Sequence, residues 1–199
     1  MKKILLISTI ALIILNCSES KPDLSTNDKI SPSNIDSLSI KKIDSTELTR
    51  YNSVKEMLED AHDFTIEQGT LKFINVDENN LHVQVSKPII ETESEKLIDE
   101  IVKRDIIYVA FQAFAQTAIN KITITSIPID PYDRTKYYDN YKKIITITRD
   151  KANQIMESEF NSLDYSILFM DLNGIQVPSK NFDKLKFDDL DYVYSELSK

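Results

Sequence analysis

The spacing of hydrophobic positions along this chain changes several times, and each change marks an element. Apolar residues three or four apart predict helices over residues 48–61, 97–118 and 152–163. Short runs that alternate or concentrate β-branched residues predict strands over 70–77, 81–88, 121–127 and 141–148. Asn173-Gly174 is a strong type I′ turn signal, and it predicts a last hairpin from residues 166–170 and 175–177.

Capping residues predict where these helices begin and end. Ser53 and Thr92 are each followed three residues later by a glutamate, which is the capping-box pattern. Asp150 is the expected N-cap of the third long helix, and Gly69 the expected stop of the first. The acidic C-terminal tail is expected to form a short helix over residues 188–197.

The order α-β-β-α-β-β-α-β-β predicts an α+β fold in one domain, residues 46–199. We expect a two-layer sandwich, in which a long central helix packs on one face of an antiparallel-rich sheet of hairpins. That helix runs from residue 92 to about residue 119. Its second half, residues 106–119, carries no charge and is therefore expected to be packed on several sides.

The N-terminus has the features of an export signal. Two lysines precede residues 4–15, an apolar run that suits a signal peptide and is too short to span a bilayer. Residues 14–17 (ILNC) bring Cys17 directly after this run, an arrangement that resembles the lipobox of bacterial lipoproteins. The resemblance covers only residues 1–17. In place of the small residue that the family prefers before the cysteine, this chain has Asn16.

The resemblance implies that residues 1–16 are removed and that Cys17 is acylated, as with palmitate. The lipid bilayer would then be a partner, and the protein would lie in the bacterial cell envelope, facing away from the cytoplasm. The alternative is ordinary cleavage after Ser20, which would release a soluble protein. Residues 17–45 are rich in serine and poor in apolar side chains, so we expect a flexible tether between the lipid and the domain.

Composition excludes several classes of function. The two glycines, Gly69 and Gly174, are far apart, whereas phosphate-binding loops need clustered glycines. A single cysteine excludes an internal disulfide framework and a multi-cysteine zinc site. The net charge of −8 becomes −10 when residues 1–16, with two lysines and no acid, are removed. This balance argues against nucleic-acid binding, which needs a basic surface.

Catalytic and metal-binding patterns are weak. Glu59 and His62 would share one face of a helix, but they supply only two of the ligands that a metal site needs. No nucleophile elbow or triad spacing is present, and no pair of carboxylates stands out. We therefore predict no cofactor, no metal site and no catalytic residue, and an enzyme is the less favoured class.

A tyrosine-rich loop is the one candidate binding site. The candidate residues are Tyr132, Tyr137, Tyr138 and Tyr141, in a charged, proline-broken segment. Exposed tyrosines give a rigid amphipathic contact surface, so the cluster favours a binding role. The alternative is that these rings fold back over the edge of the sheet. We therefore predict a non-catalytic binding or envelope-associated module with a protein partner; the alternative is a small extracytoplasmic hydrolase using acidic residues.

Overall fold

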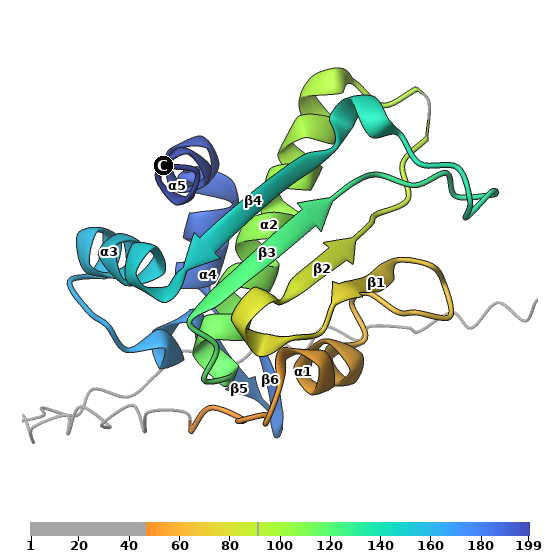
Figure 1. The fold of residues 1–199 in the computed structure, drawn as a ribbon. Helices are drawn as coiled ribbons and strands as arrows, with labels where there is room; N and C mark the ends of the chain where they lie inside the picture. The colour runs from red at the N-terminus through yellow and green to blue at the C-terminus, as the bar shows by residue number, and fades with distance from the viewer. Residues whose placement is uncertain (1–46, 91) are drawn as a thin grey trace, which may run out of the picture. The chain divides into compact units, whose positions relative to one another are not determined.

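The computed structural model describes residues 47–90 and 92–199 (Figure 1). In this part of the chain, five α-helices alternate with six strands. The helices are α1 (Val54–Ala61), α2 (Glu95–Gln116), α3 (Arg149–Phe160), α4 (Lys180–Asp183) and α5 (Leu190–Leu197). The strands are β1 (Leu71–Asn75), β2 (His82–Val85), β3 (Lys121–Ser126), β4 (Lys143–Thr148), β5 (Phe169–Leu172) and β6 (Ile175–Pro178). Three 3-10 turns and one π-helical segment complete the order. The turns are η1 (Glu78–Asn80), η2 (Asp139–Tyr141) and η3 (Tyr165–Leu168), and the π-helical segment is η4 (Lys184–Asp188).

The main sheet has the order β1-β2-β3-β4. Its outer pairs are antiparallel, whereas β2 and β3 are parallel because α2 crosses between them. Strands β5 and β6 form a separate antiparallel hairpin. The long helix α2 lies behind the main sheet in Figure 1. The predicted α+β class, with a long helix packed on one face of the sheet, is confirmed, and the four-stranded sheet is mixed.

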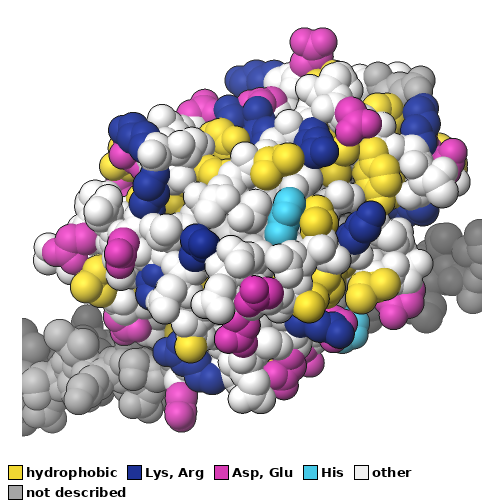
Figure 2. Space-filling view, viewed as in Figure 1, with side chains coloured by type: hydrophobic (Ala, Val, Ile, Leu, Met, Phe, Trp, Pro, Cys, Tyr) yellow, Lys and Arg dark blue, Asp and Glu magenta, His cyan; other side chains and the backbone are white. Residues whose placement is uncertain are grey.

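The core lies between α2 and the sheet. Residues on the inner face of α2, such as Ile106 and Val109, are fully buried, as are Val83, Ile122 and Ile124 on the strands. The uncharged second half of the helix is packed on several sides, as its sequence predicts. The other face of the sheet has no described helix over it. It faces the viewer in Figures 1 and 2, where apolar, charged and uncharged polar side chains are mixed.

Three of the predicted helix caps are wrong, and each has a local cause. Helix α1 ends at Ala61 because His62 adopts a left-handed conformation (φ 59°), well before Gly69. The Ser94 hydroxyl accepts from the Leu97 amide and caps α2 in place of Thr92. Thr148, the last residue of β4, caps α3 in place of Asp150, so the helix starts directly from the strand. Ser53 caps α1 as predicted.

The β5–β6 turn gives the first testable prediction. Asn173 (φ 58°) and Gly174 (φ 83°) both have the positive φ that a type I′ turn requires. We expect Gly174→Ala to lower the free energy of unfolding by about 1 kcal/mol, because alanine is strained in this conformation. A Cβ at this position would meet no atom within 4 Å, so strain is the only effect. Urea unfolding measures the loss; Asn173→Gly is the control, and an equal loss there would contradict the reasoning.

Candidate functional site

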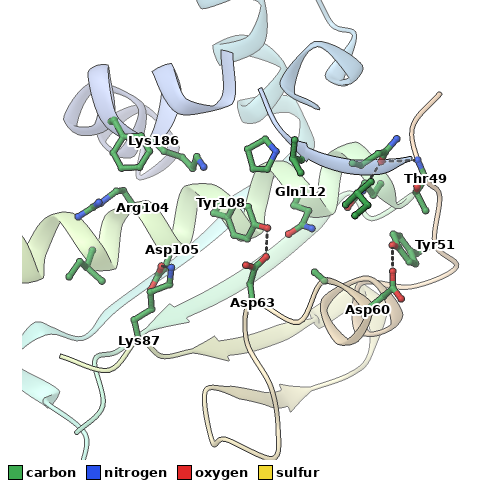
Figure 3. A pocket seen from close by; sticks show the side chains of 18 of the residues that line it. Thr49, Tyr51, Asp60, Asp63, Lys87, Arg104, Asp105, Tyr108, Gln112 and Lys186 are labelled. Carbon is green, nitrogen blue, oxygen red and sulfur yellow. Dashed lines mark hydrogen bonds and ion pairs between the residues drawn. The ribbon is translucent and has the colours of Figure 1, made fainter. Parts of the chain in front are cut away.

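A groove of about 900 Å³ runs along one face of α2 (Figure 3), a volume typical of ligand sites. Helix α2 forms its floor. Strand β6 forms one wall, and the other is formed at the end of α1 by Asp60, Ala61 and Asp63. Thr49 and Tyr51 lie at one end, and Lys87 and Lys186 lie at the opposite end.

The floor of the groove follows from helical spacing. The α2 residues that line it are three or four positions apart, which places them on one face: Leu97, Ile101, Arg104, Asp105, Tyr108, Gln112 and Gln116. Three of these are polar and almost fully buried, with exposed fractions of 4% for Asp105, 6% for Gln112 and 4% for Gln116. Polar residues at such positions need partners, because the free-energy cost of burying them alone is high.

Asp105 lies where the two parallel strands end. Its Oδ1 atom is 3.6 Å from Lys87 Nζ, just after β2, and Ser126, the last residue of β3, is among the groups that act to lower its pKa. Burial raises the pKa of Asp105 to about 7, against the opposing effect of Lys87. Ligands commonly bind beyond the carboxyl ends of parallel strands. The position and the perturbed pKa therefore mark Asp105 as a candidate functional residue.

Three oxygen atoms on the groove floor lack hydrogen-bond partners among the described residues. They are Oδ2 of Asp105, Oε1 of Gln112 and Oε1 of Gln116. Each unsatisfied buried acceptor typically costs about 1–3 kcal/mol, so such groups are rare unless water or a ligand satisfies them. Their clustering on one helix face indicates a site for a molecule that donates hydrogen bonds.

Two tyrosine–aspartate pairs join the floor to the α1 wall. The Tyr108 hydroxyl donates to Asp63, and the Tyr51 hydroxyl donates to Asp60 at 2.5 Å (Figure 3). Burial, followed by the hydrogen bond to Asp60, raises the pKa of Tyr51 to about 12. The pKa of Tyr108 is also raised, first by burial and then by Asp63. Both phenols therefore stay neutral donors at physiological pH.

The far end of the groove is cationic and aromatic. Lys186 Nζ lies 4.8 Å from the ring centroid of Phe182 and 5.3 Å from that of Tyr108, while its side chain is only 12% exposed. The Arg104 guanidinium lies 5.2 Å from the ring centroid of Phe187. Lys186 and Phe187 belong to the π-helical segment η4. Such segments occur frequently at functional sites because they redirect side chains that an α-helix would place elsewhere.

The tyrosines predicted from the sequence do not line this groove. Tyr132 is 93% exposed, whereas the other three are partly buried. The Tyr138 hydroxyl donates to Asp130 at 3.1 Å, Tyr137 pairs with Ile129 in an isolated bridge, and Tyr141 packs against the core. The structure therefore does not gather the four rings on one exposed surface, and a binding role for them stays a prediction.

The other sequence candidates lie apart from the groove or outside the described residues. Cys17, with the proposed signal peptide and tether, lies outside residues 47–90 and 92–199. Glu59 Oε1 is 3.8 Å from Lys55 Nζ, and His62 Nδ1 is 2.5 Å from the Asp60 carbonyl oxygen. Among the described residues, no group of three or more His, Cys, Asp or Glu side chains could hold a metal ion. Nor does any described helix have the length and apolarity needed to cross a membrane.

The polar residues on the helix floor are functional candidates that the charge pattern does not predict. Residues 106–119 carry no charge and are expected to be core throughout, and no role is predicted for Asp105. The signal was present: Asp105, Gln112 and Gln116 are spaced by seven and four residues, which puts them on one face of the helix. A polar row inside an otherwise apolar helix indicates a site. The walls come from distant segments, and the spacing within α2 does not reveal them.

Protein families, curated proteins and solved structures offer no match to this chain.

Proposed function

We propose that this chain is a membrane-anchored, extracytoplasmic lipoprotein whose α+β domain binds a ligand or partner in the groove along α2 without catalysis. The observation that carries the binding role is the row of three buried, unpartnered acceptors on the groove floor. Such a site binds a ligand that supplies the missing hydrogen-bond donors. It discriminates against a ligand without them, because the buried acceptors would then stay unpaired. The anchoring role rests on the resemblance of residues 1–17 to a lipobox.

The arrangement of the carboxylates favours binding over catalysis. Asp60 and Asp63 each accept a hydrogen bond from a tyrosine, so both carboxylates are already engaged. Asp105 faces Lys87. Among the described groove side chains, no hydroxyl or thiol lies beside a histidine base, which nucleophilic catalysis commonly uses.

The groove is tested by a variant that removes one acceptor. Gln112→Leu keeps the size of the side chain but removes Oε1, so we expect the partner to dissociate at least about tenfold more readily. The measurement is quantitative capture of envelope proteins by the full chain. Thr146→Val is the matched control, because Thr146 is exposed on the opposite face of the sheet. Equal capture by wild type and Gln112→Leu would contradict the proposal.

The anchor is tested separately. We expect the mature protein to begin at Cys17 and to carry acyl chains, because two or three chains on one residue hold a protein firmly in a bilayer. Mass spectrometry of the mature N-terminus measures the adduct. Cys17→Ala should move the protein from the membrane fraction to the soluble fraction. A mature N-terminus at Lys21 without lipid would contradict the anchor and support cleavage after Ser20.

One observation favours the alternative of a hydrolase. Asp105, with a pKa of about 7 in a groove, has the property that a general acid needs near neutral pH. The test is hydrolysis of chromogenic glycosides and esters by the full chain and by Asp105→Asn. If the wild type hydrolyses a substrate and Asp105→Asn does not, the protein is a hydrolase and the binding proposal is wrong. Absence of turnover in both supports binding.

A further inference from the structure

Positive side chains gather at one end of the groove, and acidic side chains line one wall. Arg104, Lys186 and Lys87 lie at the end formed by η4 (Figure 3), where Lys186 Nζ is 3.3 Å from Asp183 and Lys87 Nζ is 3.6 Å from Asp105. Asp60 and Asp63 line the wall formed by the end of α1, and Asp60 lies farther from the cationic end (Figure 3). A ligand whose own charges are separated along its length would match both the cationic end and the acidic wall, whereas a uniformly charged ligand would be repelled by one of them.

The spacing of the floor acceptors suits an extended chain. Gln112 and Gln116 are four residues apart on α2, which corresponds to about 6 Å along the helix axis. An extended peptide presents N–H groups on one side every second residue, a repeat of about 7 Å. Both unpartnered Oε1 atoms are buried, so each glutamine side chain must turn toward the groove to accept from successive N–H groups of such a peptide.

The rim of the groove is apolar. Ile175 on β6 is 66% exposed, Phe187 on η4 is 52% exposed, and Leu97 on α2 is 38% exposed. Apolar side chains of a bound peptide would cover these residues while its main chain reaches the floor. A polyamine would be repelled by Arg104 and Lys186.

Building on the proposed function, we propose that the groove binds an extended peptide segment of a partner protein in one direction. Its acidic or C-terminal end lies beside Arg104 and Lys186, and its basic or N-terminal end lies beside Asp60 and Asp63. Main-chain N–H groups donate to Gln112 and Gln116, and alternate apolar side chains contact the rim. Binding of this kind combines main-chain hydrogen bonds for affinity with side-chain contacts for specificity.

Two synthetic peptides test the direction. The forward peptide has two lysines at its N-terminus, an alternating valine–alanine centre and two aspartates at its C-terminus. The reverse peptide has the same composition with the charged ends exchanged. Calorimetric titration of the full chain should give at least about tenfold tighter binding of the forward peptide. The double variant Arg104→Glu, Lys186→Glu should remove or reverse this preference, provided that its thermal unfolding matches the wild type.

The outcomes separate this inference from the proposed function. Equal affinity for both peptides, or no binding of either, overturns the directional peptide site. Capture that depends on Gln112 would still support the groove in that case. Chitotetraose is the comparison probe: if it binds and Gln112→Leu abolishes the binding while neither peptide binds, the ligand class is wrong and the groove stands. Tight forward-peptide binding that Gln112→Leu leaves unchanged would place the peptide elsewhere and overturn the directional peptide site.

Discussion

Replacing Arg149 by lysine is expected to lower the free energy of unfolding by about 3 kcal/mol, although the charge is kept. The guanidinium donates to three carbonyl groups where α2 ends: Nη1 to Phe114 at 2.7 Å, Nη2 to Thr117 at 2.9 Å, and both Nη2 and Nε to Ile119 at 2.7 and 3.1 Å. These carbonyls have no further turn of helix to bond with. A lysine ammonium has one nitrogen and lacks the planar fork that reaches all three.

Urea unfolding of the two proteins measures this loss. Arg134→Lys is the matched control, because Arg134 is exposed and its substitution should change stability by less than about 0.5 kcal/mol. Helix α2 forms the floor of the groove, and the bonded carbonyls of Phe114 and Thr117 flank Gln116 at its end. Arg149 therefore fixes the position of Gln116 at one end of the site. Wild-type stability in Arg149→Lys would show that the helix end does not depend on the fork.

Asp105→Asn is expected to remove a pH dependence of stability. Burial raises the pKa of Asp105 from 3.8 to about 7 in the folded protein, opposed by Lys87, Arg104 and Ser126. Between about pH 4 and pH 7 the folded state holds a proton that the unfolded state has released. The free energy of unfolding that depends on Asp105 is therefore highest below about pH 4, and it falls as the pH rises to 7. The total fall is about 4 kcal/mol, at about 1.36 kcal/mol for each pKa unit.

Asparagine cannot ionise, so the variant should gain stability relative to wild type as the pH rises through this window. The measurement is urea unfolding of both proteins across the window, compared at each pH. Asp130→Asn provides the control of opposite sign. Backbone amides of Asp133 and Tyr132 lower the pKa of the partly buried Asp130 to about 2, so its contribution is lost only as the pH falls below about 4. If the difference in free energy of unfolding between wild type and Asp105→Asn stays constant from pH 4 to pH 7, the pKa of Asp105 is not raised by burial.

The fold could largely be predicted because its signals are local. Alternation at Ile122 and Ile124, the apolar stripe of α2 and the Asn173-Gly174 turn each depend on neighbouring residues. The helix ends were less predictable, because Ser94 and Thr92 offer the same hydroxyl and only the path of the chain decides which becomes the cap. The π-helical segment η4 has no sequence signal of this kind, since it results from packing of the C-terminal residues.

The candidate site could be predicted only in part. The spacing of Asp105, Gln112 and Gln116 is readable in the sequence, but their lack of partners is not. Whether these groups find partners depends on side chains from other segments, such as Lys87 and Gln176. Gln116 Nε2, for example, donates to Gln176 Oε1 at 3.3 Å, while the Oε1 atom of Gln116 has no partner. The tyrosine-rich loop shows the reverse case, in which a conspicuous pattern does not gather into one exposed surface.

Site-specific photocrosslinking tests the groove most directly. A photoreactive residue would replace Ile175 on the groove rim or Ile144 on the open face of the sheet; both are exposed isoleucines. The full chain would be crosslinked in living cells. The account predicts a defined adduct from position 175 that Gln112→Leu abolishes, and none from position 144. An adduct from position 144 alone, or one from position 175 that survives Gln112→Leu, would contradict it.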